Sequence, residues 1–496
     1  MVTQMSSKLD ALGVEIDSAA ESKNVSALTA LMEKCDSMIE SGYPHLRPIA
    51  LFYKANIYSS LAALKSHDPE YAWSWHQSEK ILEILNLRKA VSDPKFPSLD
   101  SIIQCKVYTN LGNSLNQFGR FIEAIKAWDY ALYLMPNFAM ALGNKGVGLT
   151  DYAHALYDYG HAGILVAHAV DELKGAISND ALWDSGLHPE AEKSFRKKCL
   201  SAEKYLERIE YSVDFDLNQW PVGDNRKEVE YRTWCLDNNL FLSPLNDVTK
   251  LSASAKDVLH LPSHTYNLDE EARFPNYFNI MKQEYVTARF MLFESLDYYS
   301  EHASDINVLL MDGFDGAQFN YRVEQLKVAF RLAYSIFDKV ALFLNDYYRV
   351  GLKISAVSFR KIWVQRKSKN FEINSCFAGS QNWPLRGLYY LSKDLFDDDF
   401  DDVALPEAKD LAALRNRIEH RYLSLQTYEA PVKNTDIHSY ISIDEFHLKT
   451  IKIMSMAREA LVYLSLAMHR EEEIRNIDNE KVSIPIQSLP IERFYE

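Results

Sequence analysis

Three polar residues in the C-terminal half of the sequence lie within about one and a half helical turns of each other. Arg415 and Asn416 are followed by His420, in the run Arg-Asn-Arg-Ile-Glu-His. At about 100° per residue, Asn416 and His420 share one side of a helix, and Arg415 lies at the edge of its apolar stripe. We therefore expect a cation, an amide and an imidazole close together on the surface of one helix.

These residue types suit the cleavage of RNA without a metal ion. The reaction removes the proton of a ribose 2′-OH, stabilises a more negative phosphorane and protonates the leaving 5′-oxygen. His420 can move the proton because imidazole titrates near neutral pH. Arg415 offers a planar set of donors to phosphate oxygens, and Asn416 can orient the histidine or the phosphate. One histidine does not readily act as base and acid at once, so we expect two chains to bring two motifs into one cleft.

The motif falls on a helix that we expect from Pro406 to Leu425. The apolar residues of its core side recur at helical spacing: Leu411, Leu414, Ile418, Tyr422 and Leu425. His420 lies opposite this stripe, so it is not expected to be a core histidine.

Other amphipathic segments predict a helical bundle around this helix. Long helices are expected from Asn276 to about Ser300, from Asp315 to Val350, and from the capping box Ser442-Ile443-Asp444-Glu445 onwards. Shorter helices fit around Val357 to Trp363 and Leu385 to Phe396. The sequence therefore predicts a bundle of about five helices.

The N-terminal half contains a repeat. Gly112 aligns with Gly146 at a displacement of 34 residues, the period of a tetratricopeptide helix-turn-helix unit. Small residues at Gly112 and Ala124 would let paired helices approach closely, with Trp128 filling the space around that contact. The segment resembles the tetratricopeptide family at nearly every signature position, and degenerate units fit from about residue 26 to 91 and from 137 to 206.

The motif Arg415-Asn416-x-x-x-His420 resembles the Arg-polar-x-x-x-His signature of HEPN domains. The order of the modules resembles that of bacterial HEPN proteins with N-terminal tetratricopeptide repeats. This resemblance implies metal-independent endoribonuclease activity on RNA, dimerisation through the HEPN helices as a homodimer or higher even oligomer, and frequent roles as toxins or effectors of defence against phage. The resemblance also implies that the reaction needs neither a metal ion nor a cofactor.

The predicted fold class is all-α, a tetratricopeptide-like solenoid followed by a HEPN-type helical bundle. The predicted parts are helical repeats over residues 1–206, an ordered connector over 207–275, the bundle over 276–480 and a tail over 481–496.

Charge restricts how the protein would bind RNA. A formal charge of -15 repels a polyanion on average, so RNA contacts must be local. The best basic segment contains Arg360, Lys361, Arg366 and Lys367 around Trp363, although it also fits a solvated helix end and loop. Next to the motif, the cations that would make additional phosphate contacts are Arg417 and Arg421.

Two alternatives stay open from the sequence. In a noncatalytic scaffold, Arg415 and Glu419 would form a surface ion pair, the HEPN bundle would only dimerise, and the repeat groove would bind a peptide or protein. In a metal-dependent hydrolase, Asp397 to Asp402 would hold magnesium. Acidic residues before a helix are also favoured by its dipole, which argues against the metal.

The remaining composition predicts a cytoplasmic protein that does not interact with membranes. No run of about 18 apolar residues occurs, and no basic leader precedes the first amphipathic segment. The five cysteines are widely scattered and form no C-x-x-C pair, which predicts reduced thiols and argues against structural zinc.

Overall fold

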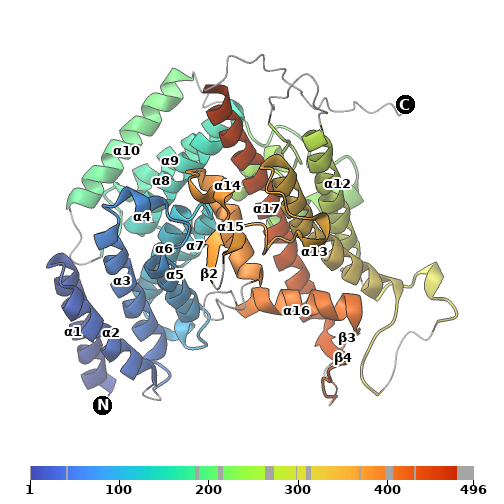
Figure 1. Cartoon of the computed structure of the whole chain (residues 1–496), viewed down its shortest axis with the longest axis horizontal. Helices are drawn as coiled ribbons and strands as arrows, with labels where there is room; N and C mark the ends of the chain where they lie inside the picture. The colour runs from blue at the N-terminus through green and yellow to red at the C-terminus, as the bar shows by residue number, and fades with distance from the viewer. Residues whose placement is uncertain are drawn as a thin grey trace.

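The computed structural model of the chain is mainly helical with very little sheet, as the sequence predicted (Figure 1). The residues that the structure describes are 2–40, 43–184, 189–209, 216–262, 273–297, 299–308, 314–367, 370–396, 406–428, 430 and 432–477. The predicted tail, residues 481–496, lies outside them. Within the described part, none of the helices combines the length and the apolarity needed to cross a bilayer.

The N-terminal half consists of successive helices that pack side by side (Figure 1). They are α1 (Val2–Glu21), α2 (Val25–Glu40), α3 (Arg47–Lys65), α4 (Pro69–Trp73), α5 (Ser78–Val91), the 3-10 helix η1 (Phe96–Ser98), α6 (Ser101–Gln117), α7 (Phe121–Leu134), α8 (Ala139–Ala155), α9 (Tyr159–Ala176) and α10 (Pro189–Arg208).

The predicted repeat coincides with the helix pair α6 and α7. A Cβ atom at Gly112 would lie 2.5 Å from Nε1 of Trp128, so no larger residue fits at this approach. Gly148 of α8 packs on the same indole, where a Cβ would also come within 2.5 Å. Trp128 is thus buried between three helices through two glycines. The tetratricopeptide assignment itself stays a prediction.

The segment between the two halves is packed against both. It contains α11 (Arg226–Asp237) and two 3-10 helices, η2 (Pro244–Asp247) and η3 (Ser252–Ser254). Arg458, from the C-terminal half, donates to Oδ1 of Asp247 at 2.6 Å and to the carbonyl oxygen of Ser243 at 2.8 Å. Tyr152 of α8 donates to Oδ2 of Asp247 at 3.1 Å. Asp247 therefore ties the segment to both halves, while the predicted connector boundaries at 207 and 275 stay predictions.

The C-terminal half is a bundle around one long central helix, α17 (Figure 1). Its elements are α12 (Arg273–Glu294), η4 (Ala303–Asp305), α13 (Tyr321–Tyr347), η5 (Ile354–Ala356), α14 (Ser375–Ala378), α15 (Trp383–Phe396), α16 (Pro406–His420) and α17 (Ile443–Ile477), with the strands β1 (Val364–Lys367), β2 (Asn370–Ile373), β3 (Tyr422–Gln426) and β4 (His438–Ser442). The predicted long helices are present, although α12 starts at Arg273 and ends at Glu294, before the expected Ser300.

The short helix predicted around Val357 to Trp363 is wrong. Phe359, Ile362 and Trp363 are buried, and their spacing imitates a helical stripe, but they lie in a turn. The chain then forms the antiparallel hairpin of β1 and β2, in which Val364 pairs with Ile373.

The predicted end of the motif helix at Leu425 is also wrong. Helix α16 ends at His420, and Tyr422 to Gln426 form β3, which pairs in parallel with β4. On the other edge of β3, the amide of Gln318 donates to the carbonyl oxygen of Leu425 at 3.0 Å. Pairing with β4, and with Gln318 at Leu425, satisfies backbone groups that a longer helix would have satisfied internally.

A buried ionic cluster joins the two halves. Asp394 of α15 accepts hydrogen bonds at 2.7 Å from Arg88 of α5 and from Arg120, which precedes α7. Next to it, Gly119 adopts a φ of +75°, and a Cβ at Gly387 would lie 2.3 Å from its carbonyl oxygen. The helix α15 therefore docks on the N-terminal half through charge and through close backbone contact.

Candidate functional site

Helix α16 lies across the bundle and contacts α13, α15 and α17 (Figure 1). Leu411 and Leu414 are buried against the core, whereas Asn416 and His420 are exposed. The predicted orientation of the motif is therefore confirmed although the end of the helix is not. As the last residue of α16, His420 can meet a ligand without displacing any core side chain.

Arg415 is held by aromatic and polar neighbours. Its guanidinium carbon lies 5.8 Å from the ring centre of Tyr334 on α13, which is within cation–π range. Its Nη1 donates to Oδ1 of Asn416 at 3.3 Å. Burial raises the pKa of the Asp338 carboxyl, while the nearby guanidinium of Arg415 and the backbone amide of Phe359 partly offset that rise. Arg415 is thus positioned by α13, with Asn416 beside it.

Glu419 does not form the surface ion pair with Arg415 that was one interpretation of the motif. Its Oε1 accepts from Nε of Arg331 on α13 at 2.9 Å. This ion pair fixes the last turn of α16 to α13, on the helix face that Glu419 shares with Arg415 one turn earlier. It leaves Arg415 over the Tyr334 ring, at the surface that carries Asn416.

The other predicted RNA-binding residues fall into two groups. Arg417 and Arg421 flank His420, with Arg421 exposed and Arg417 half-buried. Arg360 and Lys361 are exposed on a turn whose residue Phe359 donates its amide to Asp338, the carboxylate near Arg415. The fold therefore brings this turn towards the motif.

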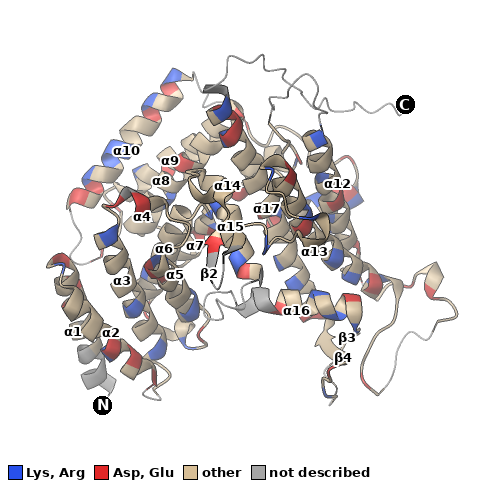
Figure 2. Ribbon diagram, viewed as in Figure 1, with Lys and Arg blue, Asp and Glu red and all other residues tan. Residues whose placement is uncertain are grey.

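Arg366 and Lys367 lie in β1, but their side chains are outside the described residues. In the view of Figure 2, both signs of charge are interspersed along the helices. The net charge predicted that contacts with RNA would be local, and this stays a prediction.

The acidic run from Asp397 to Asp402 lies outside the described residues, so the magnesium alternative is not tested there. Among the residues that the structure does describe, no group of three His, Cys, Asp or Glu side chains could hold a metal ion.

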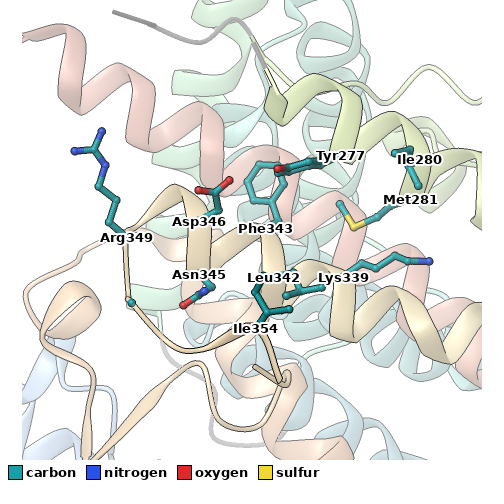
Figure 3. A pocket seen from close by; sticks show the side chains of 11 residues that line it. Tyr277, Ile280, Met281, Lys339, Leu342, Phe343, Asn345, Asp346, Arg349 and Ile354 are labelled. Carbon is teal, nitrogen blue, oxygen red and sulfur yellow. The ribbon is translucent and has the colours of Figure 1, made fainter. Parts of the chain in front are cut away.

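A groove of about 700 Å³ lies elsewhere in the bundle, between α12 and α13 (Figure 3). Its walls are mainly apolar, with Tyr277 and Met281 on α12 facing Leu342 and Phe343 on α13. Asp346 at its rim is paired with Arg273 at 2.7 Å. The residues of the motif do not line this groove. An open surface such as α16 suits a polymer strand better than a small molecule, which a concave site encloses.

The strand β3, which directly follows the motif, was not predicted from the sequence. Tyr422 lies two residues after His420, and its amide donates to the carbonyl oxygen of Ile437 at 3.0 Å. Tyr422 then pairs with His438 in the β3–β4 register. The alternation of Leu423 and Leu425 is a strand signal, but Tyr422 and Leu425 also continue the helical stripe.

The C-terminal half matches a family model. Residues 265–471 match the family described as LA2681-like HEPN, a range that includes α12 to α16 and most of α17. Neither the curated proteins nor the solved structures contain a match to the chain. The match supports a HEPN domain in the C-terminal half.

Proposed function

Taking residues 265–471 as a HEPN domain, we propose that the protein is a metal-independent endoribonuclease whose motif is Arg415, Asn416 and His420. The observation that carries the proposal is the exposure of Asn416 and His420 on the helix whose Arg415 is held by α13. The structure thus supports a charged and polar surface that a phosphodiester can reach.

In the proposed reaction, His420 removes the proton of a ribose 2′-OH. The 2′-oxygen attacks phosphorus, the bond from phosphorus to the 5′-oxygen breaks, and a protonated imidazole donates to that oxygen. Arg415 stabilises the charge on the phosphorane, and Asn416 orients the phosphate or the imidazole. The products are a 2′,3′-cyclic phosphate and a 5′-hydroxyl.

A cleavage assay with a chelator tests this proposal. Purified protein is expected to cut single-stranded RNA equally fast with and without excess EDTA, because none of the proposed steps uses a metal ion. Enzymatic end labelling should find 5′-hydroxyl ends that a kinase phosphorylates directly. Loss of cutting with EDTA, and its return with magnesium, would support the metal-dependent alternative instead.

We also propose that the complete site contains motifs from two chains. Wild-type protein co-expressed with an about ninefold excess of His420→Ala chains should then lose about tenfold in activity per wild-type chain, because most wild-type chains enter mixed dimers. Activity that is proportional to the wild-type chains alone would show that each motif works by itself. Purification through an affinity tag carried by the wild-type chain only, followed by detection of the His420→Ala chain, checks that mixed dimers form.

We propose that the N-terminal helices act as a sensor, or as a module that binds the substrate or a partner, in a toxin or an effector of defence against phage. The support is physical, since Arg88 and Arg120 of that half bind Asp394 on α15, which packs against α16. A partner that displaces these helices would therefore act on the helix next to the motif.

A further inference from the structure

The surface directly after the motif carries aromatic side chains on one face of β3 and β4. Tyr422 is 69% exposed, and its ring lies 6.3 Å from that of His438 at an angle of 72°. The high exposure leaves much of the tyrosine ring open to solvent. The rings of His438 and Tyr440 are 4.3 Å apart at 34°. The three rings form a short aromatic row, which we call the β3–β4 platform.

Hydrogen bonds fix the His438 and Tyr440 rings that lie beside Tyr422. Ser424 Oγ lies 2.8 Å from Nε2 of His438, and the Tyr440 hydroxyl lies 3.2 Å from Nδ1. The backbone of β3 is paired with β4 from Tyr422 to Gln426, and Gln318 donates to its other edge at Leu425. An aromatic ring on such a support loses little conformational entropy when a ligand stacks on it.

The platform lies beside the proposed reacting groups. Tyr422 follows His420 by two residues, so their Cα atoms are separated by no more than about 7 Å. Arg421 lies between them in the chain and is exposed. Its positive charge can attract the phosphate of an RNA backbone that runs from His420 to Tyr422. An RNA strand whose scissile phosphate lies at Arg415 and His420 would therefore place a neighbouring base within reach of the Tyr422 ring.

We propose that Tyr422, supported by His438 and Tyr440, stacks on a base next to the scissile phosphate and makes the site selective for single-stranded RNA. This inference rests on the proposed nuclease function for the position of the phosphate. Stacking needs a base with a free face, which a paired and stacked base in a duplex does not offer. Any base has such a face, so the platform selects for single strands rather than for one sequence.

Binding measured without cleavage tests the platform. In a His420→Ala background, fluorescence anisotropy would report the Kd of a labelled single-stranded RNA and of the same RNA in a duplex. Tyr422→Ala is expected to raise the Kd for the single strand by about 5- to 150-fold, the range for losing one stacked base. Tyr422→Phe keeps the ring and should stay within about twofold. Binding of the duplex should not change.

A matched control is Tyr133→Ala, because Tyr133 on α7 is 85% exposed and far from α16 in the sequence. Circular dichroism checks that each variant is folded. An unchanged single-strand Kd in Tyr422→Ala would overturn the platform, as would wild-type protein that binds no RNA or prefers the duplex. A Tyr422-dependent Kd in a protein that cuts no RNA would uphold the platform and reject the nuclease. If the protein cuts RNA but Tyr422→Ala leaves the single-strand Kd unchanged, the nuclease is supported and the platform is rejected.

Discussion

Replacing His420 with alanine is expected to lower the rate of RNA cleavage by about two to four orders of magnitude, the usual contribution of a positioned acid or base. The side chain is exposed at the last residue of α16, so stability should change by no more than about 0.5 kcal/mol. Single-turnover cleavage of a labelled RNA measures the first effect, and thermal unfolding measures the second.

The matched control for this variant is His67→Ala, another exposed histidine in the N-terminal half. It should cleave RNA at the wild-type rate. If His420→Ala also cuts at the wild-type rate, the proton is moved by another group and the assignment of the motif fails. If wild-type protein cuts no RNA under any condition, the scaffold alternative is favoured.

The helix that carries the motif could be predicted because its determinants are local. Leu411 and Leu414 recur at helical spacing and are buried as expected, which directed Asn416 and His420 outwards. The end of the helix could not be predicted in this way. Tyr422 continues the same periodicity, yet its backbone pairs with a strand that begins at His438, and single-helix periodicity contains no information about that partner.

The contacts between the two halves could not be predicted from the sequence either. Asp394 is separated from Arg88 by 306 positions and from Arg120 by 274, so no spacing rule relates them. The sequence predicted two helical modules but not their mutual packing. It did predict the charges near the motif, although the partner of Glu419 proved to be Arg331 rather than Arg415, one turn away on the same helix.

Replacing Asp394 with alanine is expected to lower the free energy of unfolding by about 3–5 kcal/mol, because it leaves two buried guanidinium groups without their shared carboxylate. Arg120 is fully buried and Arg88 nearly so, and each loses a hydrogen bond of 2.7 Å to Asp394. Glu123 remains as a partner for both arginines and limits the loss. Urea unfolding followed by circular dichroism measures the change.

The exposed ion pair of Asp410 with Lys449, at 3.2 Å, provides the control, and Asp410→Ala should cost no more than about 1 kcal/mol. The dependence on pH is a second test. Burial alone would raise the pKa of Asp394, but Arg88 and Arg120 outweigh it and hold the pKa below its usual value. The stabilisation is therefore fully present above the unfolded pKa of about 3.9 and is lost as the pH falls through the folded value. The difference in stability between wild type and Asp394→Asn should accordingly shrink in acid, and a constant difference would show that the carboxylate charge does not hold the two halves together.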